Sequence, residues 1–120
     1  MVVGLNIHDQ EISGVKIVRL EGRLDAVSSN TLEKKLGEYL SMERFRVALD
    51  FTKVEYLSSA GMRLLLAMTK NFKSHGGHLV IFAIHDNVME IIRMAGFERI
   101  LSIYPLEKEA ISAASSGPKH

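Results

Sequence analysis

Residues 46–72, RVALDFTKVEYLSSAGMRLLLAMTKNF, contain the pattern that decides the fold. Residues 46–51 are a short, mainly apolar run, which predicts a buried strand. The mostly polar residues 52–58 follow it and predict a loop. Side chains at helical spacing then mark one face of an amphipathic helix: Met62, Leu65, Leu66, Thr69 and Phe72. A strand, a loop and a helix in this order predict one unit of an α/β fold.

The same alternation continues upstream of this unit. Residues 5–8 and 15–20 show strand patterns on either side of a Ser13-Gly14 turn, which predicts an antiparallel hairpin. A second amphipathic helix is expected between this hairpin and residue 46. Its start is expected among Ser28, Ser29 and Asn30.

Downstream, residues 79–84 form an almost wholly apolar run, as expected for a strand that is buried on both faces of a parallel sheet. Gly76-Gly77 ends the helix before it. Asp86 or Asn87 is expected to cap a third helix, which Gly96 ends. A strand at 100–103 and a last helix with Pro105 in its first turn, through about residue 114, are expected to follow. The prediction is a single α/β domain over residues 1–114, with a mixed, mostly parallel sheet covered by about four helices. Residues 115–120 are expected to be a disordered tail.

Composition narrows the function. The chain has 120 residues, 47% of them hydrophobic, which suits one folded domain. Its net charge of +1 comes from interspersed acids and bases, so we expect no direct nucleic-acid or membrane partner. There is no cysteine, and no apolar stretch is long enough for a membrane span. Without a secretory signal pattern at its start, the protein is expected to be cytoplasmic.

Ser58 and Ser59 are the most prominent candidates for chemistry. They stand at a predicted helix start, where free backbone N–H groups and the helix dipole favour anions. Ala60 and Gly61 leave space around them. A phosphate on either serine would therefore find donors nearby. The alternative is that one of the serines only caps the helix.

Several short motifs together resemble the anti-sigma factor antagonist family, whose fold is the STAS domain. Residues 22–25, GRLD, resemble its Gly-x-Leu-Asp, and residues 57–61, LSSAG, resemble its Asp-Ser-x-Gly phosphorylation segment. Gly76-Gly77, residues 95–97 and the spacing of all four motifs also match. The resemblance implies that Ser59 is the phosphoacceptor, although Ser58 stands where the family usually has Asp. It also implies that Asp25 lies beside the phosphorylation site. The alternative is that Asp25 only caps or orients the first helix.

The resemblance implies a partner switch and not an enzyme. The unmodified protein would bind an anti-sigma factor that is also a serine protein kinase, and so free a sigma factor. Phosphorylation of Ser59 by that kinase would release the protein, and a serine phosphatase would reset it. No cofactor of its own is expected. The alternatives are a STAS scaffold that is not phosphorylated, a nucleotide or small-molecule sensor, and a hydrolase that uses Ser58 or Ser59.

Other residues give weaker signals. Asp50 lies at the end of the predicted strand and is expected to anchor the loop after it. The five histidines show no metal-ligand spacing and are expected on the surface. Met62, Met94 and Phe97 are candidates for a partner-binding patch, because adaptable apolar side chains beside Ser59 would suit one. The alternative for the methionines is that they fill the core.

Overall fold

Five strands form one sheet in the order in which they occur along the chain. The computed structural model describes residues 4–115. Strand β1 (Leu5–Ile12) pairs antiparallel with β2 (Val15–Leu24). Strands β3 (Arg46–Leu57), β4 (His78–Phe82) and β5 (Ser102–Tyr104) extend the sheet in parallel from β2. The predicted α/β class and the N-terminal antiparallel hairpin are confirmed.

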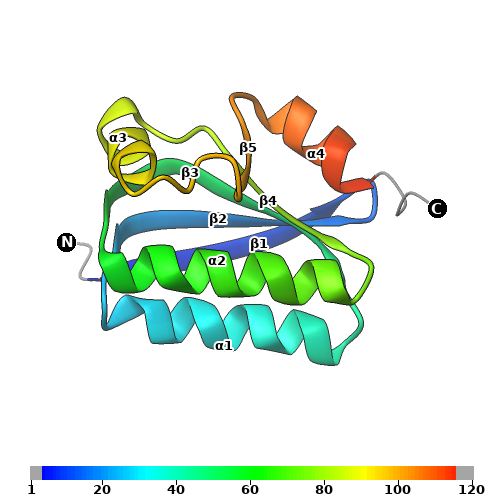
Figure 1. Cartoon of the computed structure of the whole chain (residues 1–120). Coiled ribbons are helices and arrows are strands. Elements are labelled where there is room, and N and C mark those ends of the chain that lie inside the picture. The colour runs from blue at the N-terminus through cyan, green and yellow to red at the C-terminus, as the bar shows by residue number, and fades with distance from the viewer. Residues whose placement is uncertain (1–3, 116–120) are drawn as a thin grey trace.

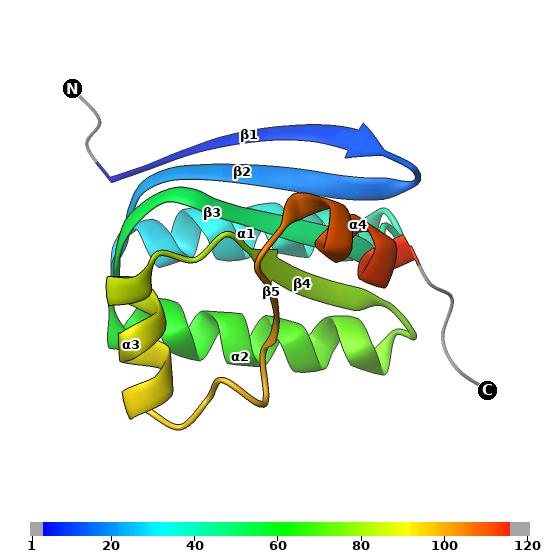
Figure 2. The same ribbon diagram turned by 90° about the horizontal axis from the view of Figure 1, so that it is seen from above.

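The four helices of the described chain cover the sheet unequally. Helices α1 (Ser28–Ser41) and α2 (Ser59–Ser74) lie side by side on one face (Figure 1). On the opposite face, α4 (Glu107–Ser115) packs over β3 and β4 (Figure 2). Helix α3 (Asp86–Met94) lies at the end of the sheet where α2 begins (Figures 1 and 2).

Two apolar clusters hold these layers together. The larger lies between the sheet and α1 and α2, and it also takes in Val88 and Ile92 of α3. The smaller lies under α4, where Ala110 and Ala114 are fully buried against large strand side chains such as Ile17 and Phe82. Small side chains on α4 let its backbone come close to the sheet.

The predicted loop at residues 52–58 is mostly strand. β3 continues to Leu57, and its buried positions recur at every third residue, at Phe51, Val54 and Leu57. Its pairing with β2 has two register shifts, between Arg19 and Glu21 and between Gly22 and Arg23. Each shift adds one residue to β3, so the period of two that marks a strand is lost. The loop prediction was wrong for this reason.

The remaining differences lie at element ends. β4 stops at Phe82, because Ala83 has a φ of 60° and leaves the strand. The expected cap of α3 was wrong: Asp86 is the first residue of the helix, and His85 stands at the N-cap position without a side-chain capping bond. Pro105 precedes α4 instead of lying in its first turn. Of the predicted tail, Ser115 is the last residue of α4, and residues 116–120 lie outside the described part of the chain.

Candidate functional site

The carboxyl ends of β2 and β3 meet the starts of α1 and α2 at one edge of the sheet (Figure 1). Leu24 pairs with Leu57 at the last register position of the two strands. One residue further on, the Ser58 N–H donates to the Leu24 carbonyl oxygen at 2.9 Å. Asp25 directly follows Leu24, and Ser59 directly follows Ser58. The topology therefore brings the two candidate motifs, GRLD and LSSAG, together at this edge.

The two adjacent serines do different things. Ser58 has an extended backbone and caps α2, since its Oγ accepts a hydrogen bond from the Gly61 N–H at 3.1 Å. Ser59 is the first residue of α2 and is exposed. Its hydroxyl makes no hydrogen bond to any other residue between 4 and 115. The capping role thus belongs to Ser58, and the Ser59 hydroxyl remains accessible.

Gly61 lets α2 start close to the strand ends. A Cβ at this position would lie 2.8 Å from the Leu24 carbonyl oxygen and 3.0 Å from Leu57 Cδ1. Both neighbours belong to the central strands, where backbone shifts are costly. Ala60, by contrast, is half-buried. Gly61 therefore sets how near Ser59 lies to the Asp25 loop.

Gly61→Ala is expected to lower the free energy of unfolding by about 1–2 kcal/mol, because overpacking costs about 1–3 kcal/mol and helix propensity returns part of it. Gly37 in α1 is the matched control, because a Cβ there meets nothing within 4 Å. Gly37→Ala should stabilise the protein by about 0.5–1 kcal/mol. Urea denaturation of both variants measures these changes, and equal effects would contradict the role given to Gly61.

Asp25 holds the chain just before the first helix, whose N-cap position is Val27. Asp25 Oδ1 accepts hydrogen bonds from the N–H groups of Ser28 and Val27, at 2.9 and 3.1 Å, and from Ser28 Oγ at 3.1 Å. The bonds from Ser28 are the largest cause that holds the pKa of the Asp25 carboxyl below its ordinary value. Ser28 is buried, and its single hydroxyl hydrogen is shared between Asp25 Oδ1 and the nearer Arg23 carbonyl oxygen, which lies 2.6 Å from Oγ. These bonds agree with the alternative in which Asp25 orients the first helix, and the residue still stands at the same edge as Ser59.

The partner-binding candidates separate by burial. Met62 is only 7% exposed and belongs to the larger core cluster, so its assignment to an exposed patch was wrong. Helix α2 starts at Ser59, so Met62 lies in its first turn. It shares the buried face of the helix with Leu65. Met94 is 81% exposed at the end of α3. Phe97 is half-buried and packs against the core.

Three further residues of this edge were not singled out from the sequence. Val27 precedes α1 and is 80% exposed, although it is apolar. Arg23 and Tyr56 are opposite each other on β2 and β3, and the guanidinium lies 4.2 Å from the centre of the Tyr56 ring. Tyr and Arg are the residue types that most often anchor protein interfaces. The signal that was available for Val27 was its place outside the apolar stripe of the following helix.

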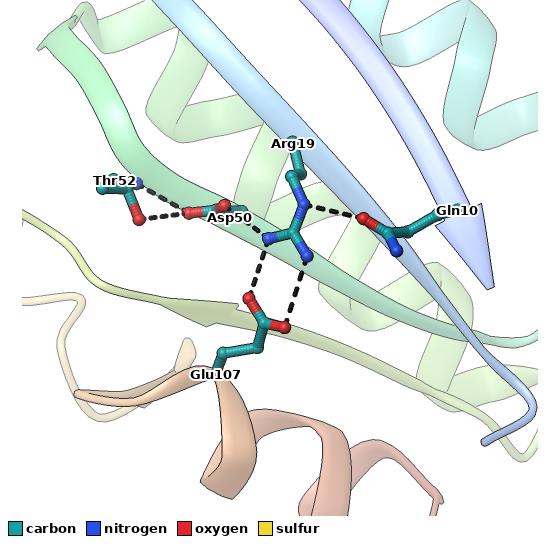
Figure 3. A network of polar contacts seen from close by, with 5 residues as sticks. All are labelled: Gln10, Arg19, Asp50, Thr52 and Glu107. Carbon is teal, nitrogen blue, oxygen red and sulfur yellow. Dashed lines mark hydrogen bonds and ion pairs between the residues drawn. The ribbon is translucent and has the colours of Figure 1, made fainter. Parts of the chain in front are cut away.

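Asp50 lies within β3 and does not anchor a loop after it, so that expectation was wrong (Figure 3). The carboxylate is buried, and its Oδ2 lies 2.8 Å from Arg19 Nη1. Its Oδ1 accepts from the backbone N–H and the hydroxyl of Thr52. Arg19 also binds both carboxylate oxygens of Glu107, and its Nε donates to Gln10. The network ties α4 to the central strands.

The pKa of Asp50 reflects this environment. Burial acts to raise the pKa, but the hydrogen bonds from Thr52 and the Arg19 charge outweigh it and hold the pKa of the carboxyl below its ordinary value. The pKa of Arg19 is raised, chiefly by its hydrogen bonds to Glu107. Both groups are therefore charged near neutral pH and fully paired. This is the chemistry of a structural ion pair, and it lies on the sheet face opposite α1 and α2.

Among residues 4–115, no group of three or more His, Asp or Glu side chains is placed to hold a metal ion. His8, His75 and His85 are exposed, whereas His78 is half-buried. His120 lies outside the described residues. Nor is any helix within 4–115 long and apolar enough to cross a membrane.

The protein is thus a small α/β domain in which a capped helix start lies beside the ends of two parallel strands. The family model described as the STAS domain matches residues 6–110. The chain belongs to the STAS domain family.

Relatives and solved structures agree with this assignment. BtrV of Bordetella bronchiseptica, a protein assigned as an anti-sigma factor antagonist, is 31% identical over 106 residues, which cover 88% of this chain and 89% of BtrV. A structure assigned as an anti-sigma factor antagonist from Thermotoga maritima has a TM-score of 0.85 at 19% identity and covers 92% of this chain and 95% of its own. The anti-sigma factor antagonist SpoIIAA in its unphosphorylated form has a TM-score of 0.75 at 16% identity, over 90% of this chain and 95% of its own. A structure of the Bacillus protein SpoIIAA in the phosphorylated form has a TM-score of 0.68 at 15% identity, over 90% and 98% of the two chains.

Proposed function

We propose that the protein is an anti-sigma factor antagonist whose partner binding is switched off by phosphorylation of Ser59. The observation that carries the proposal is that Ser58 caps α2 and Ser59 does not. Ser58 Oγ accepts the hydrogen bond from the Gly61 N–H at the start of α2. The Ser59 hydroxyl is exposed and makes no hydrogen bond within residues 4–115. A kinase can reach such a hydroxyl without first opening the fold. The relatives named as anti-sigma factor antagonists support the same function.

The partners follow from this function. The unmodified protein binds an anti-sigma factor that is also a serine protein kinase, and this binding frees a sigma factor. The kinase transfers a phosphoryl group from ATP to Ser59, and a serine phosphatase removes it. The protein itself is a binding partner without catalytic activity or a cofactor of its own. We expect it to act in the cytoplasm, where sigma factors work.

Ser58, where the family usually has Asp, is compatible with this switch. Ser and Asp are both among the best N-cap residues, so the exchange keeps the start of α2 intact. Ser58 makes the capping bond to Gly61 that an Asp side chain would make. The exchange removes one negative charge beside Ser59, which affects the choice of kinase more than the geometry of the acceptor.

The hydrolase alternative gains no support from the geometry. Within the described range 4–115, neither Ser58 nor Ser59 is hydrogen-bonded to a His, Asp or Glu side chain. A serine nucleophile needs such a base to be activated.

Incubation with ATP and the cognate kinase, followed by mass spectrometry, tests the phosphoacceptor. Ser59→Ala should abolish phosphate incorporation, because it removes the accessible hydroxyl. Ser58→Ala should remain a substrate and lose only about 1 kcal/mol of stability, the typical contribution of an N-cap. The opposite pattern, with phosphate on Ser58, would contradict the proposal.

The apolar residues exposed at this end of the molecule are proposed to contact the partner. Met94→Glu should leave the free energy of unfolding within about 0.5 kcal/mol of the native protein, as surface changes do, and weaken partner binding by at least about tenfold. Met62→Glu should instead unfold the domain, because it buries an unpaired charge in the core. Thermal melts and titration calorimetry separate these effects. If Met94→Glu binds the partner as tightly as the native protein, Met94 lies outside the interface.

A further inference from the structure

Arg63 stands four residues after Ser59 on the same helix, and both side chains are exposed. In an α-helix, side chains at i and i+4 are neighbours on one face, about 5–6 Å apart at Cβ. An acid that precedes a base by four residues is the favourable order for such a pair. Arg63 is therefore in register to meet a negative charge that appears at position 59.

Within residues 4–115, Arg63 also lacks a competing counter-ion. Its guanidinium makes no ion pair or hydrogen bond with another side chain between residues 4 and 115. The first turn of α2 contains no acidic residue. Helical side chains lean toward the N-terminus of their helix, so a side chain at position 63 is placed to reach the turn that begins with Ser59. Of the nearby cations, Arg23 is already stacked on Tyr56.

We propose that Arg63 receives the phosphate of phosphorylated Ser59 in an intrahelical ion pair. The inference rests on the proposed function only in taking Ser59 as the residue that carries the phosphate. Guanidinium groups suit this role, because their planar fork can bind two phosphate oxygens at once. Phosphorylation then changes the surface in two ways. It adds a dianion at position 59 and also withdraws a free cation that the unmodified protein presents to its partner.

The test uses the full chain with phosphoserine installed at position 59 by nonsense suppression, so that no kinase is needed. Phosphorus NMR then follows the second pKa of the phosphate, which is ordinarily about 6. An arginine that pairs with the dianion lowers this pKa. Arg63→Gln is expected to raise the phosphate pKa by about 0.2–0.4 unit relative to the native sequence, from the usual strength of a helical i,i+4 pair.

Two variants make the result specific. Lys70→Gln removes the same charge from an exposed position of α2 that is out of reach of residue 59, so it should leave the phosphate pKa unchanged. Arg63→Lys should retain part of the shift, because it keeps the charge and loses the fork. An unchanged pKa in Arg63→Gln, or an equal change in Lys70→Gln, would overturn the pairing. Absence of phosphate on Ser59 after treatment with the kinase would instead overturn the proposed function and leave this measurement intact.

Discussion

One phosphate on Ser59 is expected to weaken binding of the anti-sigma factor about a hundredfold while the domain stays folded. The phosphate adds about −1.5 to −2 charges near neutral pH. A partner that covers Ser59 must remove water from this group, and poorly paired buried charge is costly. Even about 3 kcal/mol lowers the affinity by roughly a hundredfold, since each 1.4 kcal/mol is a factor of ten.

The fold should tolerate the same phosphate because of where Ser59 lies. The residue is exposed at the start of α2, whose first turn has no acidic residue. An anion at a helix N-terminus gains about 0.3–1 kcal/mol. The Asp25 carboxylate at the same edge offsets some of this gain, although its hydrogen bonds point it toward the start of α1. The net effect on the free energy of unfolding should therefore be within about 1 kcal/mol.

Titration calorimetry with the partner and thermal melts measure the two effects separately. Phosphoserine at position 41 is the matched control, because Ser41 is exposed and is the last residue of α1. Helix α1 ends far from the start of α2 (Figure 1). It adds the same charge to the molecule and should leave partner affinity almost unchanged. A collapsed melting temperature after modification of Ser59 would mean that the fold is the switch. Unchanged affinity would remove the switch altogether.

The architecture was predictable because its strands and helices bury their apolar residues in regular patterns. The apolar run at residues 79–84 could be assigned to a buried parallel strand, and β4 is indeed the strand between β3 and β5. The end of β3 could not be predicted in the same way. Its bulges change the spacing of Phe51, Val54 and Leu57 to three residues, which removes the alternation by which a strand is recognised.

The site was predictable only in part, for a related reason. Local chemistry identified Ser58 and Ser59 as residues at a helix start, but it could not say which of them is the cap. The cap depends on the residue at which α2 begins. The same starting residue fixes which side chains of the helix face the sheet, and Met62 is one of them. Asp50 was misread because its ion-pair partner Arg19 is 31 residues away in sequence and that arginine's other partner, Glu107, is 88 residues away from it, and only the folded chain brings the three together.

Replacing Asp50 with Asn is expected to lower the free energy of unfolding at neutral pH by about 2–3 kcal/mol. The Asp50 side chain is 12% exposed, and its carboxylate accepts bonds from both Arg19 and Thr52. An Asn side chain can still accept from Thr52, but it then turns its NH₂ group toward the Arg19 guanidinium, donor against donor. Bonds to charged groups contribute about 1.5–3 kcal/mol, and a fully buried ion pair costs about 3–5 kcal/mol to break. The expected loss is smaller than that for a fully buried pair, because Arg19 remains paired with Glu107 in the variant.

Glu107→Gln is the matched control, because it removes a carboxylate from the same arginine. The Glu107 side chain is 38% exposed, so its pair with Arg19 should contribute no more than about 1 kcal/mol. Urea denaturation of both variants at neutral pH compares the two carboxylates directly. If Asp50→Asn loses no more stability than Glu107→Gln, the buried Arg19–Asp50 pair contributes no more to stability than the exposed Arg19–Glu107 pair.

The dependence of stability on pH separates the loss of the ion pair from a packing effect of the Asp50→Asn substitution. Because the pKa of Asp50 is lower in the folded protein than its ordinary value, the folded state binds this proton less readily than the unfolded chain does. The stabilisation by Asp50 is therefore complete above the ordinary carboxyl pKa of about 3.9 and is lost as the pH falls through the lower pKa of the folded state. Asp9 and Asp25, whose pKa values are also lowered, make native protein and variant alike less stable in acid. The difference between the two proteins should consequently narrow below about pH 4. A difference that stays constant from neutral to acid pH would mean that the substituted amide destabilises the protein through its shape and that the charge of Asp50 contributes nothing.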